Sequence, residues 1–280
     1  MGSVRSLNFN GIATISDLQT EEWKSLFRSM EAEQAAFLAK EHLFRSPEYA
    51  WPRDPLHTWS RLWEYPYAYF HIENWLREHP ARPMAVADVG SGVTFFPFQI
   101  AKLGATVICT DNDVVTERDI ERASAVVEST PGAVEFRRTD GQSLPFKDAE
   151  LDVIYCISVL EHVDDIASLV QEIARSLKPG ALFVLTIDLD LRGDQDLGVA
   201  RRIELGSTLD KYFEAGALYR ALVHPGDILQ SNRSLYPVTP MDGLWWNVKQ
   251  HILKPLLRRK PRNRAPFHLA VEGFVMNRKK

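Results

Sequence analysis

The chain has 280 residues and a formal net charge of −4, with 45% hydrophobic and 25% charged residues, which excludes a mostly disordered chain. The charge is uneven. Residues 249–280 hold ten of the 33 Lys and Arg but only one acid, Glu272, so +9 at this end offsets −13 over residues 1–248. The acidic body disfavours a nucleic-acid partner, because it repels a phosphate backbone.

The two cysteines, Cys109 and Cys156, each lie in a short apolar run and have no CxxC partner. We therefore expect buried thiols, with neither a disulfide nor a metal site. The first residues lack the pattern of an export signal, and no apolar run reaches the roughly 18 residues of a membrane span. A cytoplasmic location is the expectation.

Two aromatic helices are predicted first in the chain. One carries Trp23, Leu26, Phe27 and Met30 at helical spacing, and Ser16 with Gln19 forms a candidate capping box. The second has a stripe predicted to be core: Tyr65, Ala68, Tyr69, Ile72, Trp75 and Leu76. Its other side is expected to face a pocket or solvent: Tyr67, Phe70, His71 and Asn74. We expect residues 1–82 to form a helical extension or lid.

From about Met84 to Ile187, short β-rich runs alternate with helical patterns, which predicts a parallel sheet covered by helices. The predicted strands are Ala85–Val89, Thr106–Thr110, Val134–Arg137, Val153–Ile157 and Leu182–Ile187. The predicted helices are Phe95–Leu103, Thr116–Glu128 with Thr116 as N-cap, and Asp164–Leu177. In such a sheet, ligands bind at the carboxyl ends of the strands.

The run Asp88-Val89-Gly90-Ser91-Gly92 places two glycines between a predicted strand and a helix. Glycines allow a sharp turn and a close approach of the backbone to a ligand. A dinucleotide site needs a third glycine where Phe95 stands, and Asp88 is unfavourable beside a pyrophosphate. The pattern therefore predicts a ligand that is less anionic than NAD.

Two more acids follow successive predicted strands. Asp111 stands 21 residues after Gly90, a spacing at which a carboxylate can accept both ribose hydroxyl protons. Asp140 follows the third strand, where it could accept from an adenine amino group. Each acid alone could be a turn or cap residue, but three acids at three successive strand ends favour a nucleoside site.

Several motifs together resemble class I S-adenosylmethionine-dependent methyltransferases, especially the small-molecule branch. They are the glycine run, Asp111, Thr139–Phe146, Ser158–Val163 and Leu177–Ala181, which span about residues 84–187. One departure is Thr94, where many members have glycine. The resemblance implies S-adenosylmethionine as cofactor and the following site residues: Asp88, Gly90, Ser91 and Gly92 at the methionine end, Asp111 at the ribose, Asn112, Asp140 and Gly141 at the adenine, and the backbone of Cys156 and Ile157 near the sulfonium.

The resemblance also implies the architecture: a Rossmann-like, seven-stranded, mostly parallel α/β sheet with helices on both faces and an antiparallel last strand. Leu269–Met276 fits that last strand. We expect residues 83–280 to form the methyltransferase domain, with an insertion at about 219–264 and no clear place for the sixth strand.

Methyl transfer is an in-line displacement that depends on positioning, and an oxygen nucleophile also needs a base. The candidate catalytic residues are His162, Asp188 and His71, with His224 and Asp190 as further polar groups near strand ends or turns. Simple structural roles for them stay open, since His162 could orient its loop and Asp188 could begin a turn. The fourth strand lacks the Asn/Asp-Pro-Pro-Tyr motif that DNA-base methylases share, so we expect a small-molecule acceptor.

Residues 244–264 combine Trp245 and Trp246 with an apolar stripe and a basic end. This segment could pack on the domain, contact a membrane surface, form a lid or join two copies of the chain. Two functions are carried forward. One is methyl transfer to an oxygen or nitrogen of a small molecule, such as a sugar, a glycan intermediate or a secondary metabolite. The other is a non-catalytic protein that binds S-adenosylmethionine and retains the fold.

Overall fold

The computed structural model describes residues 7–80, 84–192, 197–242 and 268–280. The helices are α1 (Glu21–Ala39), α2 (Glu41–Phe44), α3 (Arg61–Glu78), α4 (Phe96–Ala101), α5 (Val114–Ser124), α6 (Ile166–Ser176) and α7 (Val199–Tyr212), with short 3-10 turns η1 (Ser16–Gln19), η2 (Leu160–His162) and η3 (Pro225–Asp227). The strands are β1 (Gly11–Ile12), β2 (Ala85–Val89), β3 (Thr106–Asp111), β4 (Ala133–Arg138), β5 (Leu151–Ile157), β6 (Leu177–Asp190), β7 (Phe213–Ala215) and β8 (Leu269–Arg278).

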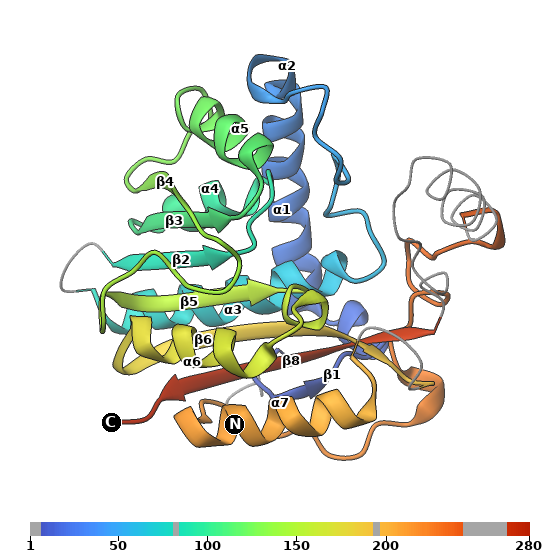
Figure 1. Ribbon diagram of the computed structural model, residues 1–280. Helices are drawn as coiled ribbons and strands as arrows, with labels where there is room; N and C mark the ends of the chain where they lie inside the picture. Colours follow the sequence, from blue (N-terminus) through green and yellow to red (C-terminus); the bar gives the residue numbers. More distant parts are fainter. Residues whose placement is uncertain (1–6, 81–83, 193–196, 243–267) are drawn as a thin grey trace, which may run out of the picture.

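The strands form one sheet in the order β1-β8-β6-β5-β2-β3-β4, and β7 also pairs with β8. The pairs among β2 to β6 are parallel, whereas β8 runs antiparallel to β6. The arrow of β8 accordingly points against those of β2, β3 and β5 (Figure 1). This confirms the predicted α/β class, its five central strands and its antiparallel last strand.

The alternation of strand side chains gives the sheet two apolar faces. One cluster contains Val86 and Tyr155 and packs under α1, α3, α4 and α5. The other contains Ile154 and Phe183 and packs under α6 and α7. Figure 1 shows α6 and α7 in front of the sheet and α1 and α3 behind it. The ends of the central strands are thereby held between two helical layers.

Two predicted helix starts were wrong because other side chains cap the helices. Ser16 bonds to Asp227 through both its N–H and its hydroxyl, and Thr20 instead caps α1 by accepting from Trp23 N at 3.3 Å. Asp113 caps α5, whereas Thr116 is buried inside the first turn. Both observed caps are ordinary N-cap residues, four positions after Ser16 and three positions before Thr116.

The side of α3 predicted to face a pocket or solvent is instead covered by the N-terminal segment. Tyr67 donates to the carbonyl of Phe9 at 2.7 Å, and His71 Nε2 lies 2.9 Å from the carbonyl of Leu7. Both side chains and Phe70 are buried. Burial lowers the pKa of His71 to about 4, so its ring is neutral and donates to Leu7.

The edge of the sheet beyond β8 is shared by two short strands. β1 pairs with β8 through Gly11 and Ile12, and β7 pairs with it further along. The chain's early residues thus join the sheet that residues 83–280 were expected to form without them. β7 occupies the place left open for the sixth strand, directly before the expected insertion at 219–264. Most of that insertion, including 244–264, lies outside the described residues.

A proline inside α3 has a donor supplied from another helix. Pro66 has no N–H to give to the carbonyl of Leu62, four residues before it. The indole Nε1 of Trp23 donates to that carbonyl at 2.9 Å instead. Trp23 in α1 therefore satisfies a buried acceptor that the sequence of α3 leaves open.

We expect Trp23→Phe to lower the free energy of unfolding by about 1–3 kcal/mol, because the buried carbonyl of Leu62 loses its donor. Trp51, whose side chain is exposed, provides the matched control Trp51→Phe, which should change stability little. Urea unfolding measures both variants. Equal, small effects would contradict this role of Trp23.

Candidate active site

The loop after β2 bends back over the sheet at two glycines. Gly90 and Gly92 have φ values of +72° and +54°, which favour glycine. The N–H groups of Gly90 and Ser91 both donate to the carbonyl of Thr110, at 2.9 and 3.1 Å. A Cβ on Gly90 would lie only 2.5 Å from Cγ2 of Val159. The loop is therefore pressed between β3 and the segment that follows β5.

Asp111 ends β3 beside this loop. Its Oδ2 accepts from Gly92 N at 3.2 Å and its Oδ1 from Asp113 N at 3.0 Å. Asn112 N–H also bonds to this carboxylate, and because a carboxylate has about four acceptor positions, it can still accept from a hydroxyl of a ligand. Partial burial raises the pKa of Asp111. The geometry suits a ligand that offers two hydroxyl donors side by side, as a ribose does.

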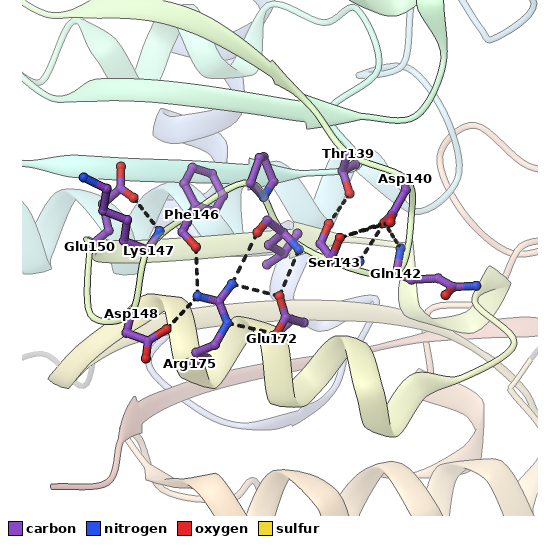
Figure 2. Close-up of polar contacts among 12 residues, drawn as sticks. Thr139, Asp140, Gln142, Ser143, Phe146, Lys147, Asp148, Glu150, Glu172 and Arg175 are labelled. Carbon is purple, nitrogen blue, oxygen red and sulfur yellow. Dashed lines mark hydrogen bonds and ion pairs between the residues drawn. The ribbon is translucent and has the colours of Figure 1, made fainter.

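The expected adenine residues lie at the next strand end. A Cβ on Gly141 would lie 3.2 Å from the side-chain nitrogen of Asn112, so these two residues face each other across a narrow gap. Asp140 is exposed, and its Oδ1 accepts from the N–H groups of Gln142 and Ser143 at 2.8 and 2.7 Å (Figure 2). These bonds lower the pKa of Asp140. Asp140 thus stabilises its own turn.

The segment that follows Asp140 is fastened to α6 by one arginine. Arg175 donates to the carbonyls of Phe146 and Leu144 at 2.8 and 3.3 Å, and Glu172 accepts from Leu144 N at 3.1 Å (Figure 2). Arg175 and Glu172 also form an ion pair at 2.8 Å. These contacts hold the backbone that follows the Asp140 turn against α6.

Asp88 lies one residue before the end of β2, opposite Tyr155 in β5. Its carboxyl is buried, and burial raises its pKa to about 8, although the Tyr155 hydroxyl and the Arg61 guanidinium act in the opposite direction. A cationic ligand beside Asp88 would favour its ionised form. The Cys156 side chain is buried against α6, so this residue can contribute only its backbone to the site, whereas the Ile157 side chain is buried in the other cluster.

A polar network lies at the ends of β5 and β6. Ser158, with φ +49°, donates to Glu64 Oε1 at 2.7 Å and lies 3.4 Å from Asp188 Oδ1. Thr186 donates to the same Glu64 oxygen at 2.6 Å. Arg61 forms an ion pair with Glu64, and its Nη1 donates to Ser158 Oγ at 2.8 Å. A non-glycine residue at positive φ is a strained position of the kind found at functional sites.

Glu161 adds a second buried carboxyl to this network. Its Oε1 accepts from Asp188 N at 3.1 Å, while its buried Oε2 has no hydrogen-bond partner among the described residues. Burial and the neighbouring Glu64 raise the pKa of Glu161. An incoming donor group could bond to this oxygen.

The three predicted catalytic residues do not come together. Asp188 lies in the network at the strand ends, whereas His162 is exposed at the end of η2. His71 is seven residues from Glu64 on α3, which is about 10 Å along the helix, and it is bonded to Leu7. His224 caps the turn at η3 by accepting from Gly226 N.

Five polar residues near the site were missed in the sequence: Arg45, Tyr49, Arg61, Glu64 and Glu161. Arg61 and Glu64 carried a usable signal, because an i, i+3 ion pair amid the aromatic residues Trp63 and Tyr65 is out of place on a core helix. Arg45 and Tyr49 carried no local signal, since they contact a loop more than 40 residues away.

The residues present fit the methyl donor S-adenosylmethionine. The glycine turn brings backbone without a side chain to the ends of β2 and β3, Asp111 is a half-buried carboxyl beside it that can accept from hydroxyls, and Asp88 is a carboxyl suited to a cationic group.

Comparison with known proteins also points to a methyltransferase domain. The sequence profile of the methyltransferase domain family matches residues 87–185, the segment that holds the glycine turn, Asp111, Asp140 and the end of β5. Residues 87–185 therefore form a methyltransferase domain of this family. The sequence of the chain is 32% identical over 176 residues to an uncharacterized methyltransferase of Mycobacterium leprae (strain Br4923), covering 61% of each chain. It is 34% identical over 123 residues to an O-methyltransferase of Aspergillus sclerotiorum, covering 43% of this chain and 46% of that one.

A solved structure resembles most of the chain in fold. The solved structure of the cyclase SpnF superposes with a TM-score of 0.52, at 14% identity, covering 89% of this chain and 94% of that one. This likeness shows the fold alone. The chain spans about three fifths of the length of the mycobacterial relative, so the comparisons establish the methyltransferase domain and leave its acceptor to the chemistry of the site.

Among residues 7–80, 84–192, 197–242 and 268–280, no helix is long and apolar enough to cross a bilayer.

We expect Gly90→Ala to lower the free energy of unfolding by more than about 2 kcal/mol and to abolish binding of the demethylated product S-adenosylhomocysteine. The new Cβ would add a clash with Val159 to the cost of a positive φ, which alone is about 1–2 kcal/mol. Gly180→Ala is the matched control, because Gly180 has φ +79° and nothing lies within 4 Å of its Cβ. Urea unfolding and calorimetry should separate the two; equal losses in both would refute the packing argument.

Glu161→Gln should flatten the pH dependence of stability. In the folded protein the raised pKa keeps Glu161 protonated above about pH 4.5, where the unfolded chain has lost that proton. The wild type therefore loses stability as the pH rises from there toward the raised pKa, by up to about 1.4 kcal/mol per pH unit from this group.

The variant cannot ionise, so its free energy of unfolding should gain on the wild type as the pH rises. Thermal unfolding between pH 4.5 and 8 measures this difference, with the exposed Glu121→Gln as control. Parallel pH profiles for wild type and Glu161→Gln would show that Glu161 ionises normally.

Proposed function

We propose that this methyltransferase moves a methyl group from S-adenosylmethionine to an oxygen or nitrogen of a small molecule. The observation that carries the proposal is the glycine turn beside Asp111, a half-buried carboxyl at the end of β3 that can accept from a ligand hydroxyl. The Aspergillus O-methyltransferase supports oxygen as the acceptor atom. The formal charge of −13 over residues 1–248 supports a small molecule over a nucleic acid.

When bound, S-adenosylmethionine supplies an electrophilic methyl group on a cationic sulfur. Asp88 lies beside its methionine end, Asp111 holds the ribose, and Asn112 and Gly141 enclose the adenine. The backbone of Cys156 and Ile157 and the strained Ser158 place the acceptor at the ends of β5 and β6. In-line geometry in a site closed to water accounts for most of the rate.

Asp188 is the proposed proton acceptor for a hydroxyl nucleophile. Its half-buried carboxylate lies 3.4 Å from Ser158 Oγ, at the strand ends where the acceptor is placed. Arg61 and Glu64 orient Ser158 from the other side. His162, adjacent to Glu161 in η2, is the second candidate, because it is exposed and near the same strand end.

Asp188→Asn should lower kcat by about 10²- to 10⁴-fold, the usual contribution of a general base, and leave the affinity for S-adenosylhomocysteine within a factor of two. The rate is measured as S-adenosylhomocysteine released over a panel of phenols, sugars and amines. Asp164→Asn, in the exposed turn after η2, is the control and should keep full activity. A full rate in Asp188→Asn would transfer the proton-accepting role to His162.

The same panel distinguishes a catalyst from a binding protein. Release of S-adenosylhomocysteine that depends on an acceptor supports the enzyme. Tight binding of S-adenosylmethionine without turnover of any acceptor would favour the non-catalytic alternative, and binding of NAD alone would refute both.

A membrane contact or a homodimer through residues 244–264 stays a proposal, since this segment lies outside the described residues. Flotation with anionic and neutral liposomes and sedimentation of the whole chain test the two interactions.

A further inference from the structure

Residues 45–49, which lie outside the region matched by the family, bond to the backbone of the glycine loop. Residues 45–49 follow α2, and the chain after α2 runs along the side of the sheet toward which β2 and β3 point (Figure 1). Tyr49 Oη accepts from Val93 N at 2.9 Å, and both terminal nitrogens of Arg45 donate to the carbonyl of Val93 at 3.3 Å. Both backbone polar groups of Val93, one residue after Gly92, are therefore bound by this segment.

Arg45 is held in place by an unusual environment for a cation. Its side chain is 1% exposed and forms an ion pair with Glu41 at 2.5 Å. The guanidinium lies over the rings of Phe37, Phe44 and Tyr49, at 5.8, 5.7 and 4.6 Å from their centres. Burying a cation is costly unless it is well paired, so Arg45 is a rigid support for both Val93 and Tyr49.

The hydroxyl of Tyr49 lies beside Gly92 of the glycine turn and has a hydrogen to donate. The side chain is 9% exposed, and its Oη would lie 3.1 Å from a Cβ on Gly92. Asp111 is close enough to affect its ionisation. Tyr49 Oη accepts from Val93 and Arg45, and in the described part of the chain no acceptor is found for its own hydrogen.

We propose that Tyr49 is a ligand-binding residue of this site, whose hydroxyl donates to an oxygen of the bound methyl donor, either a ribose hydroxyl or the amino-acid carboxylate. Arg45 is the positioning residue that fixes it. The inference rests on S-adenosylmethionine being the ligand, as proposed above. It makes the segment before the family-matched region part of the cofactor site.

Calorimetry with S-adenosylhomocysteine tests the proposal on the full chain. Tyr49→Phe should raise the dissociation constant about 10-fold, the effect of one hydrogen bond to a polar ligand group. Tyr236→Phe is the matched control at a tyrosine whose ring packs on His57, and it should bind like the wild type. If the wild type itself does not bind, the proposed function fails; if Tyr49→Phe binds as tightly as the wild type, only this inference fails.

Altered ligands separate direct contact from a structural effect on the loop. The loss caused by Tyr49→Phe should disappear with the analogue that lacks the contacted oxygen, which is either the 2′-deoxy, the 3′-deoxy or the decarboxylated form of S-adenosylhomocysteine. Disappearance with one of these analogues identifies the oxygen. An equal loss with all three would show that Tyr49 only supports Val93, and would overturn the proposal.

A measurement on the wild type covers the case in which the variant does not fold. Hydrogen exchange with and without S-adenosylhomocysteine should show new protection in residues 45–51 together with 90–94. Protection confined to 90–94 would contradict a direct role for Tyr49.

Discussion

The turn at Gly90 and Gly92 is the constraint on which the rest of the site depends. It follows the central strand β2, and its first two N–H groups are bound to the carbonyl of Thr110 in β3. Because Val159 packs where a Cβ of Gly90 would stand, the chain after β5 is drawn against the same turn. The ends of three neighbouring strands are thereby brought around one short stretch of bare backbone, where a ligand can approach closely.

Part of the excess of acidic residues over residues 1–248 lies at the strand ends around this turn. Asp88 is buried, Asp111 is half-buried and accepts from the N–H groups beside it, and Asp140 is exposed and bound to its own turn. These three environments suit a cationic end, a pair of hydroxyls and a ring at the edge of solvent. A second group of carboxyls, Glu64, Glu161 and Asp188, surrounds the adjoining strand ends with Arg61 as counter-ion.

Features that depend on local sequence were predictable. The strand from Ala85 to Val89 and the last strand from Leu269 are apolar runs that the sequence itself marks. Asp111 and Asp140 could be placed at one site because neighbouring parallel strands end at the same edge of the sheet. Features that depend on contacts distant in sequence were not. The strand β1 has only two residues, too few for a recognisable pattern. Residues 7–9 cover Tyr67 and His71, so the face of α3 that was expected to be open is buried.

The site showed the same division. Asn112 and Gly141 were placed from motif order and do lie together. Glu161 was passed over for its neighbour His162, because the sequence does not show which of two adjacent polar side chains in η2 turns inward. Arg45 and Tyr49 belong to a segment whose contact with Val93 only the folded chain reveals.

The central claim is that the glycine turn and Asp111 hold the methyl donor with its sulfur toward the ends of β5 and β6. A crystal structure of the protein with S-adenosylhomocysteine tests it most directly. The account predicts the two ribose hydroxyls within hydrogen-bond distance of Asp111 Oδ1 and Oδ2, and the sulfur between Gly90 and Ser158. A ligand bound elsewhere, or one that leaves Asp111 without contact, would contradict it.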